Sequence, residues 1–564
     1  MTVQKSPREW NALYYPYLLY MHIYRKCVFA LFAIAVLPLQ AQTSDDKGIT
    51  VNGSVQSDVL IGQKDEAIGA EKPEEWMLTN TYADVNVQSK HLNAGARLAF
   101  NRYPLPGYER DFKGWGVPYY YLTGKLGKTE LTLGSFYEQF GSGFVLRTYE
   151  ERSLGIDSHI QGARIVSTPV NGVRMKALTG RQRRYWDYND SWMSGADIEL
   201  NFEAWSRRMR EAGWVVSLGA SVVNKFEKEE HDNILIDQAH RLRLPEKVNA
   251  CDVRLRVQRG AWNVLGEYAW KTHDPSFDNG YIYHHGSVAM LSASYSRRGL
   301  SLLAQAKRSD DMQWRSRRSM TGISSMINHL PAFTQDQTYS LAAMYPYATQ
   351  GSGEWAYQLQ AGYRLKPKTT LGGRYGTFLK VNFSYVTGLD KRPHSLKGYT
   401  TPMGSDGYAA SFWGHSGEKY YQDINLQAER RITKDFRLNL MYMNQSYNQS
   451  IIEGHGDMIH SNIFVAEGRY NVSRRLILRA EAQYLATKQD KGDWLFGLVE
   501  ASLGRHFMLT VSDQYNAGST HEHYYNALLT STFGAHRLAV GYGRTRAGFN
   551  CAGGVCRYVC QPLL

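Results

Sequence analysis

Leu92-Asn93-Ala94-Gly95-Ala96-Arg97-Leu98-Ala99-Phe100-Asn101 is the stretch that decides the fold, because apolar and polar side chains alternate along it. Successive side chains of a β-strand point to opposite faces. One face of this segment therefore carries Leu92, Ala94, Ala96, Leu98 and Phe100, and the other carries Asn93, Gly95, Arg97 and Asn101. Strands in soluble domains are usually about five or six residues long. Alternating strands of about ten residues with polar groups facing inward are typical of barrels whose apolar face meets lipid.

Similar segments recur from about Ile49 to the end of the 564-residue chain, separated alternately by tight turns and long polar loops. We therefore predict an all-β fold, a large antiparallel transmembrane β-barrel of about 24 strands, within a range of about 22 to 26. The predicted strands are 49–61, 78–89, 91–103, 117–126, 129–140, 159–169, 172–184, 193–205, 213–227, 247–259, 261–273, 286–298, 299–310, 337–349, 355–366, 377–389, 419–432, 436–448, 462–473, 475–487, 493–505, 506–517, 524–535 and 536–548.

The connections between these strands indicate which end of the barrel is which. Asn171-Gly172 fits a two-residue hairpin turn of the primed type, and Arg259-Gly260 and Arg298-Gly299 are equally short. Outer-membrane barrels place short turns in the periplasm and long loops outside the cell. The long loops, such as 229–246 and 311–336, are therefore expected to lie outside.

This alternation of short and long connections breaks once. If 371–376 is an outer loop, the long segment 390–418 is periplasmic and every later short turn faces outward. We therefore expect either a miscount of one strand near 355–418 or a part of that region folded into the lumen. With this correction, strand 536–548 runs outward and the loop that holds Cys551 and Cys556 is extracellular.

The residues after that loop form an unusual end for a barrel. Arg557 to Leu564 are too few to cross a membrane, and they lack the terminal aromatic residue common on bacterial barrels. An open seam would leave backbone groups unpaired in hydrocarbon, at several kcal/mol each. We therefore predict an abnormal end. It is either the stub of a strand lost through truncation or frame shift, or an imperfect closure between the first and last strands.

The N-terminal region has the composition of a targeting segment. No run reaches the roughly 18 apolar residues of a transmembrane helix. The longest apolar run, 27–39, follows two basic residues and precedes an A-x-A-like cleavage site ending at Ala41, as in a secretory signal peptide. Met21 opens a more ordinary signal peptide than Met1 does. We therefore assign residues 1–20 to an upstream extension, 21–41 to the signal peptide and 42–564 to the outer-membrane barrel.

The chain is basic, with 65 Lys and Arg residues against 52 Asp and Glu residues, a formal net charge of +13. The basic residues are scattered over turns, loops and polar strand faces, without the clustered patch of a nucleic-acid-binding protein. We therefore expect no nucleic-acid partner. A solvated lumen with loops near anionic lipid is the simpler interpretation. It predicts the cell outer membrane as the location, with outer-membrane lipid and lipopolysaccharide as partners and envelope proteins as further candidates.

Five cysteines are present, and Cys27 leaves with the predicted signal peptide. Cys251 falls on the apolar face of its strand, where it acts as a small hydrophobe. Cys551 and Cys556 flank two glycines that would let a short loop close as a disulfide in an exported protein, and a pairing with Cys560 stays open. A zinc site would need four ligands, so the sequence predicts neither a metal nor another cofactor.

Charged residues on the polar strand faces are predicted to line the lumen. Facing lipid at mid-depth, each Arg or Lys would cost about 2–4 kcal/mol, so these side chains belong inside, and a barrel this wide has an aqueous or plugged interior. The candidates are Arg97, Asp252, Arg254, Arg256, Glu267, Glu429, Glu467, Arg469, Arg479 and Glu481.

The segment Gly134–Arg152 differs from the other connections, because it is dense in aromatic residues, glycines and paired charges. Its aromatic residues are too apolar for a free outer loop, and its charges are unsuited to lipid. We predict that it bends into the lumen and constricts it. The alternatives are that it only fixes an extracellular loop against the rim, or that it recognises a ligand. The charged candidates are Glu138, Arg147, Glu150, Glu151 and Arg152.

Together with 371–376 and the loop between Cys551 and Cys556, this segment resembles an uncharacterised family of outer-membrane β-barrels of Bacteroidota. The resemblance spans essentially the whole mature chain. It implies a porin-like fold and an outer-membrane location, and the family brings no established activity. The odd C-terminus departs from the family pattern, which puts the closure of the barrel in doubt.

The sequence does not favour an enzyme. No G-x-S-x-G nucleophile elbow is present, Gly141-Ser142-Gly143 lacks the lysine of a phosphate-binding loop, and the histidines near 284 and 521 fall in loops. We expect a porin-like channel that passes small polar solutes through a charged lumen partly constricted by 134–152. The alternative is a non-conducting barrel that serves as a scaffold or partner in a surface or secretion complex.

Overall fold

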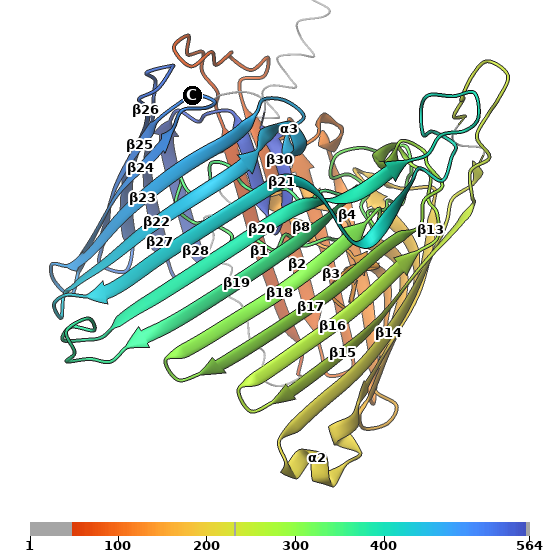
Figure 1. The fold of residues 1–564 in the computed structure, drawn as a ribbon. Helices are drawn as coiled ribbons and strands as arrows, with labels where there is room; N and C mark the ends of the chain where they lie inside the picture. The colour runs from red at the N-terminus through yellow and green to blue at the C-terminus, as the bar shows by residue number, and fades with distance from the viewer. Residues whose placement is uncertain (1–47, 230–232, 560–564) are drawn as a thin grey trace, which may run out of the picture.

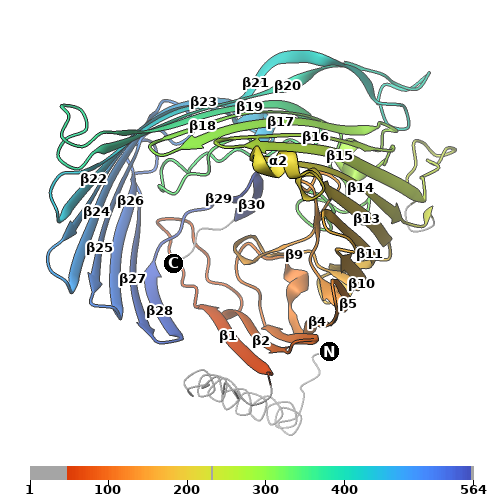
Figure 2. The ribbon, with the colours of Figure 1, turned by 90° about the horizontal axis from the view of Figure 1, so that it is seen from below.

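One antiparallel β-sheet curves round an interior and forms nearly the whole chain (Figures 1 and 2). The computed structural model describes residues 48–229 and 233–559. The sheet has 24 strands, and the long strands that follow one another along the chain pair in antiparallel register. The predicted all-β barrel of about 24 strands is therefore confirmed.

The strands of this sheet are long and closely spaced in sequence, as a hairpin-connected barrel requires. They are β1 (Thr50–Leu60), β2 (Leu78–Gln88), β3 (Leu92–Asn101), β4 (Gly114–Leu126), β5 (Thr129–Phe136), β10 (Ile160–Ser167), β11 (Val173–Arg184), β12 (Asp187–Tyr188), β13 (Trp192–Asn201), β14 (Trp214–Phe226), β15 (Lys247–Arg259), β16 (Trp262–Lys271), β17 (Gly286–Arg297), β18 (Leu300–Asp310), β19 (Gly353–Leu365), β20 (Thr377–Pro393), β21 (Tyr408–Arg431), β22 (Phe436–Asn448), β23 (Met458–Asn471), β24 (Leu476–Thr487), β25 (Trp494–Leu503), β26 (Phe507–Asn516), β27 (His523–Phe533) and β28 (His536–Gly543).

The remaining elements are short and lie in the connections. They are β6 (Gln139–Phe140), β7 (Leu146–Arg147), β8 (Glu150–Glu151), β9 (Ile156–Asp157), β29 (Gly548–Ala552), β30 (Val555–Val559), the 3-10 turns η1 (Arg110–Phe112), η2 (Arg152–Leu154), η3 (Phe202–Ala204) and η5 (Phe277–Asn279), and the helices α2 (Arg207–Glu211) and α3 (Gln449–Ile452). Over the described ranges, no helix is long and apolar enough to cross a membrane.

The two faces of each long strand differ as the alternation predicts. On β23, Phe464 points outward and is 47% exposed, whereas its neighbours Ile463 and Val465 point inward and are buried. On β21, Leu426 faces outward and Asp423 is buried on the inner face. An outward apolar belt over polar inner positions is the pattern of a barrel that contacts lipid.

The predicted strand 337–349 is wrong. This stretch has no strand assignment, and Leu341, Met344 and Tyr347 are buried inside the barrel. Pro346 cannot donate a ladder hydrogen bond, and apolar side chains that pack against the interior need no lipid. Removing this strand restores the alternation. The turn 366–376 then lies with the short turns, and the connection 394–407 lies with the long loops at the other end (Figure 1).

The first and last long strands form the two edges of the sheet. Because β12 has only two residues, 23 long strands remain, and β1 and β28 therefore run in the same direction, β28 toward the long loops as predicted. Among the described residues, no register joins β1 to β28, although Arg544 Nε lies 2.6 Å from Asp65 Oδ2 at the loop end. Every residue of β1 from Thr50 to Val59 is exposed.

Several predictions fall on residues that the structure does not describe. The upstream extension 1–20, the signal peptide 21–41 with Cys27, and Cys560 lie outside the described ranges.

Candidate functional site in the barrel interior

The connection between β5 and β10 lies inside the barrel. Phe140, Phe144, Val145 and Leu146 are fully buried, in one cluster with inward residues of the wall. The backbone amide and hydroxyl of Ser142 donate to Glu267 on β16, with the hydroxyl at 2.6 Å. The aromatic and aliphatic side chains of this connection therefore pack in the interior, where its composition predicted them to lie.

The charges at the start of this connection pair with the wall. Glu138 accepts from Lys176 of β11 at 2.7 Å and from Arg164 of β10 at 3.3 Å. Its carboxylate therefore ties the beginning of the connection to two neighbouring strands. Arg147 lies over the ring of Tyr149, at 4.9 Å.

The charges further along hold η2 to β2 and β3, near the β1 edge of the sheet. Glu150 accepts from Arg97 of β3 and from Arg152, each at 2.7 Å. Arg97 also donates to Asp84 of β2 at 2.7 Å, and Glu151 caps η2 by accepting from the backbone amide of Ser153 at 3.1 Å. Four of the five predicted charges of 134–152 thus form ion pairs or a cap, and the fifth, Arg147, contacts an aromatic ring.

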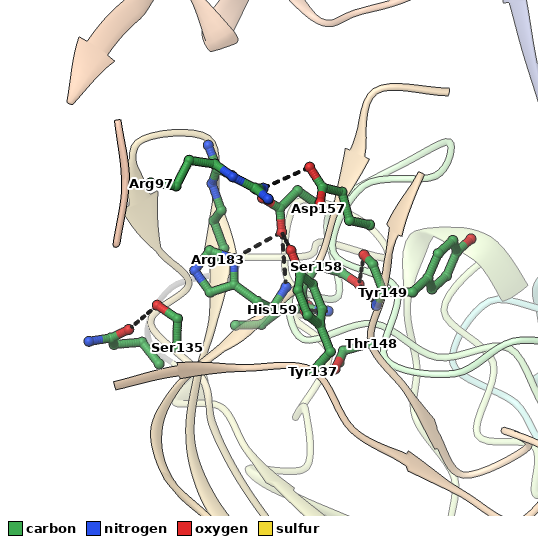
Figure 3. Close-up of polar contacts among 12 residues, drawn as sticks. Arg97, Ser135, Tyr137, Thr148, Tyr149, Asp157, Ser158, His159 and Arg183 are labelled. Carbon is green, nitrogen blue, oxygen red and sulfur yellow. Dashed lines mark hydrogen bonds and ion pairs between the residues drawn. The ribbon is translucent and has the colours of Figure 1, made fainter. Parts of the chain in front are cut away.

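A buried polar cluster fixes the return of this connection to the wall (Figure 3). Asp157 accepts from the Tyr137 hydroxyl at 2.8 Å, lies 2.9 Å from His159 Nδ1, and pairs with Arg183. These donors hold the pKa of Asp157 well below its usual range despite burial. The Ser158 hydroxyl bonds the backbone of Tyr149 instead of the imidazole. The cluster is therefore a structural clasp and not the acid–base–nucleophile arrangement of a hydrolase.

The connection between β18 and β19, residues 311–352, is a second interior segment. It interlocks with the first, because the amide of Arg147 donates to the Ile327 carbonyl at 2.8 Å and the Asn328 side chain donates to the Phe144 carbonyl at 2.9 Å. Trp314 is fully buried in the same cluster. Sequence reasoning missed this segment, because 337–349 was predicted as a strand and 311–336 as an outer loop, whereas Trp314 and Ile327 pack in the interior. The break in the alternation and Pro346 were the signals that could have revealed it.

A buried ion pair of the barrel wall holds this second segment through hydrogen bonds. Lys307 Nζ of β18 lies 2.9 Å from Glu354 Oε1 of β19, and both side chains are fully buried. Lys307 also donates to the Pro331 carbonyl at 2.6 Å, and the amide of Gln350 donates to Glu354 at 2.9 Å. The Tyr347 hydroxyl donates to the same carboxylate. This single pair thus anchors three points of the segment.

The far end of the second segment contacts strands further along the sheet. The Tyr339 hydroxyl donates to Glu467 of β23 at 2.9 Å, and the backbone amide of Leu341 donates to the side-chain oxygen of Gln483 of β24 at 2.8 Å. The segment therefore contacts the inner wall from β18 and β19 to β23 and β24.

The predicted lumen residues of the wall form two further charge clusters. On one side, Arg254 pairs with Asp252 at 3.0 Å and with Asp197 of β13 at 2.5 Å. On the other, Arg479 lies 3.5 Å from Glu467 and also pairs with Glu481. Each arginine of these two clusters is thus paired with carboxylates on its own or a nearby strand.

The other predicted wall charges lie nearer the short turns. Glu429 pairs with Arg437 at 3.1 Å, and Arg256 and Arg469 are exposed on the inward faces of β15 and β23. They do not belong to the two clusters above.

The inward faces change from buried to exposed along the barrel axis. On β23, Ile463 and Val465 are buried under the interior segments, whereas Arg469, nearer the short turns, is exposed. On β15, Ala250 is buried and Arg256 is exposed. The loop-side half of the interior is therefore filled by the chain itself, and the half near the short turns is accessible to water.

A third interior element is the hairpin β29–β30, which Cys551 and Cys556 join by a disulfide. The prediction of an extracellular loop here is wrong. Val555 packs in a buried cluster with Leu154 and Ile156, and the Gly554 carbonyl accepts from the amide of Thr349 at 3.0 Å. The hairpin lies inside the barrel because the apolar side chain of Val555 packs there against Leu154 and Ile156. Cys251 is a free, exposed thiol on β15.

The interior offers no obvious centre for metal chemistry. Over residues 48–229 and 233–559, no group of three or more His, Cys, Asp or Glu side chains is placed to hold a metal ion.

Comparisons with solved structures show a likeness in fold. OccK5 (OpdH) of Pseudomonas aeruginosa matches with 12% identity and a TM-score of 0.34, covering 74% of this chain and 96% of that one. The P pilus usher PapC translocation pore matches with 11% identity and a TM-score of 0.39, covering 88% and 95%. A mutant of the ferric enterobactin receptor PfeA from Pseudomonas aeruginosa matches with 7% identity and a TM-score of 0.41, covering 87% and 80%.

No curated protein matches the sequence. A family model described as a family of unknown function, DUF6029, matches residues 23–562. Because this match spans nearly the whole sequence, the chain belongs to the DUF6029 family.

Proposed function

We propose that this protein is an outer-membrane barrel that passes small polar solutes through its lumen, past a constriction in the loop-side half. Short turns at one end, long connections at the other and an apolar outward belt support a place in an outer membrane. The predicted signal peptide supports export to that compartment.

The observation that carries the proposal is the change of exposure along the inward strand faces. Buried Ile463 and exposed Arg469 lie on the same face of the same strand, six residues apart. A packed protein core would bury both, whereas an unobstructed pore would expose both. A lumen narrowed by interior segments over part of its length accounts for the difference.

The exposed half of the lumen carries both signs of charge. Arg437 and Glu429 are 58% and 43% exposed and pair with each other, and Arg479 lies among three carboxylates, including Glu500 at 3.7 Å. Alternating charges of this kind favour passage of small polar solutes with weak ion selectivity, because neither sign dominates the field.

Planar-bilayer recording of the purified barrel tests the proposal. Discrete conductance steps with weak cation or anion preference are expected. Electrical silence of a barrel that is folded, as shown by heat-modifiable mobility, would refute the channel.

The tight interlock of 137–159 with 311–352 favours a second candidate function, a non-conducting scaffold in a surface or secretion complex. That candidate predicts silence in the same recording, together with envelope proteins that co-purify in fixed proportion.

A further inference from the structure

A cavity of about 850 Å³ lies at the loop end of the interior, where segments far apart in the sequence meet. The connection 106–110, the connection 320–326 and the hairpin residues 554–557 form its walls. Its volume is within the range of about 300–1,000 Å³ typical of sites for small molecules.

One wall of the cavity is apolar. Met320, Ile323 and Met326 are partly exposed to it, and Leu330 and Val555 are buried behind them. Val555 and Ile323 belong to the cluster formed with Leu154 and Ile156 of the first interior segment. This wall is therefore held in place by buried packing, and its exposed thioether and aliphatic groups can receive apolar side chains.

The lining of the same cavity also carries an excess of guanidinium groups. Glu109 accepts from Arg557 at 3.2 Å and from the Ser324 and Tyr185 hydroxyls, so its negative charge is already satisfied. Arg110 lines the same cavity and is exposed at its rim. The net charge of the cavity lining is therefore positive, and the exposed guanidinium group of Arg110 carries it.

A smaller adjoining cavity strengthens this bias. It shares Glu109, Tyr185 and Arg557 with the larger one and is also lined by Arg184. The buried Nε of Arg184 has no hydrogen-bond partner among the described residues. The guanidinium group of Arg184 adds a further positive charge beside Arg557.

We propose that this cavity binds a short apolar peptide through its free carboxylate. The apolar wall would receive its side chains, Arg110 and the guanidinium groups beside it would bind the carboxylate, and Gly107, Gly322 and Gly554 let the ligand backbone approach the walls closely. This binding does not rest on conduction, because a silent barrel would show it equally.

Titration calorimetry of the whole barrel in detergent tests the proposal. The probe is acetyl-Leu-Ala-Leu as the free acid, and the matched control is the same peptide with a C-terminal carboxamide. We expect the acid to bind about tenfold more tightly than the amide, the ratio of one charge-assisted hydrogen bond. Arg110→Gln should remove most of this preference, because Arg110 lines the cavity and is exposed to solvent.

Two further variants separate a cavity effect from a general effect. Ala348→Trp places a large ring in the cavity and should abolish binding of both peptides. Arg392→Gln removes an exposed charge at the end of β20, outside the cavity lining, and should leave both affinities unchanged. Equal affinities for acid and amide, unchanged binding by Ala348→Trp, or no saturable binding up to about 10 mM would each overturn the proposal. Conductance, measured separately, bears only on the channel.

Discussion

Lys307→Met should loosen the second interior segment from the barrel wall. Lys307 and Glu354 are both fully buried and lie 2.9 Å apart. Without the lysine, the Glu354 carboxylate stays buried but loses the positive charge beside it. Removing one member of a buried ion pair costs about 3–5 kcal/mol.

For Lys307→Met, the contacts that Glu354 keeps put the expected loss of stability at the lower end of that range. The Tyr347 hydroxyl and the Gln350 amide still donate to Glu354 after the substitution, so we expect a loss of about 3 kcal/mol in the free energy of unfolding. The double variant Lys307→Met/Glu354→Gln removes both charges and keeps an acceptor for Tyr347. It should recover at least half of that loss, because no uncompensated charge remains.

Equilibrium urea unfolding of the detergent-solubilised barrel, followed by tryptophan fluorescence, measures these differences, since Trp314 is fully buried in the segment. The control is Lys64→Met, which removes an exposed ion pair with side chains 55% and 83% exposed and should change little. If the double variant were as unstable as Lys307→Met, or if the single variant cost less than about 1 kcal/mol, the anchoring role of this pair would be wrong.

Three further predictions follow from the interior segments. Deletion of 142–152 should raise single-channel conductance without preventing assembly, and an unchanged conductance in a folded deletion would reject the constriction. Burial and the cations of Arg147 and Lys307 lower the pKa of His329 to about 3, below its unfolded value of about 6.5. The unfolded chain is therefore protonated first, so stability should fall as the pH drops from about 6.5 toward 3, and His329→Gln should flatten that dependence in urea unfolding at several pH values. Reduction of the Cys551–Cys556 disulfide should speed proteolysis after residue 544 while the barrel stays resistant, and equal cleavage rates with and without reductant would contradict a stabilising role.

The alternation of apolar and polar residues was enough to predict the wall, because lipid on one side and a wet interior on the other impose a strict period of two. Leu426 outward and Asp423 inward on β21 are examples. The same reasoning failed at 337–349, where Leu341 and Met344 are apolar for a different reason. They pack inside the barrel, and local periodicity does not distinguish a lipid contact from an interior contact.

Composition also predicted the inward position of 134–152, since Phe140 and Phe144 needed burial while Glu138 and Glu150 needed partners. Those partners could not be predicted, because Lys176 and Arg97 lie on other strands that come near only when the sheet has folded. The position of Cys551–Cys556 was mistaken for the same reason. The direction of β28 correctly predicted that the hairpin lies at the long-loop end of the barrel. It could not predict that Val555 packs inside the barrel.

Thiol accessibility along β23 measures directly whether the loop-side half of the lumen is filled and the other half is open to water. In a Cys251→Ala/Cys560→Ala background, Ile463→Cys and Arg469→Cys each place one thiol on the same inward face. A membrane-impermeant maleimide is then applied to the barrel in lipid vesicles with both ends accessible. We expect rapid labelling at 469 and slow labelling at 463, with faster labelling at 463 when 142–152 is deleted. Equal rates at the two positions, whether both fast or both slow, would contradict a lumen that is filled in its loop-side half and open to water in the other.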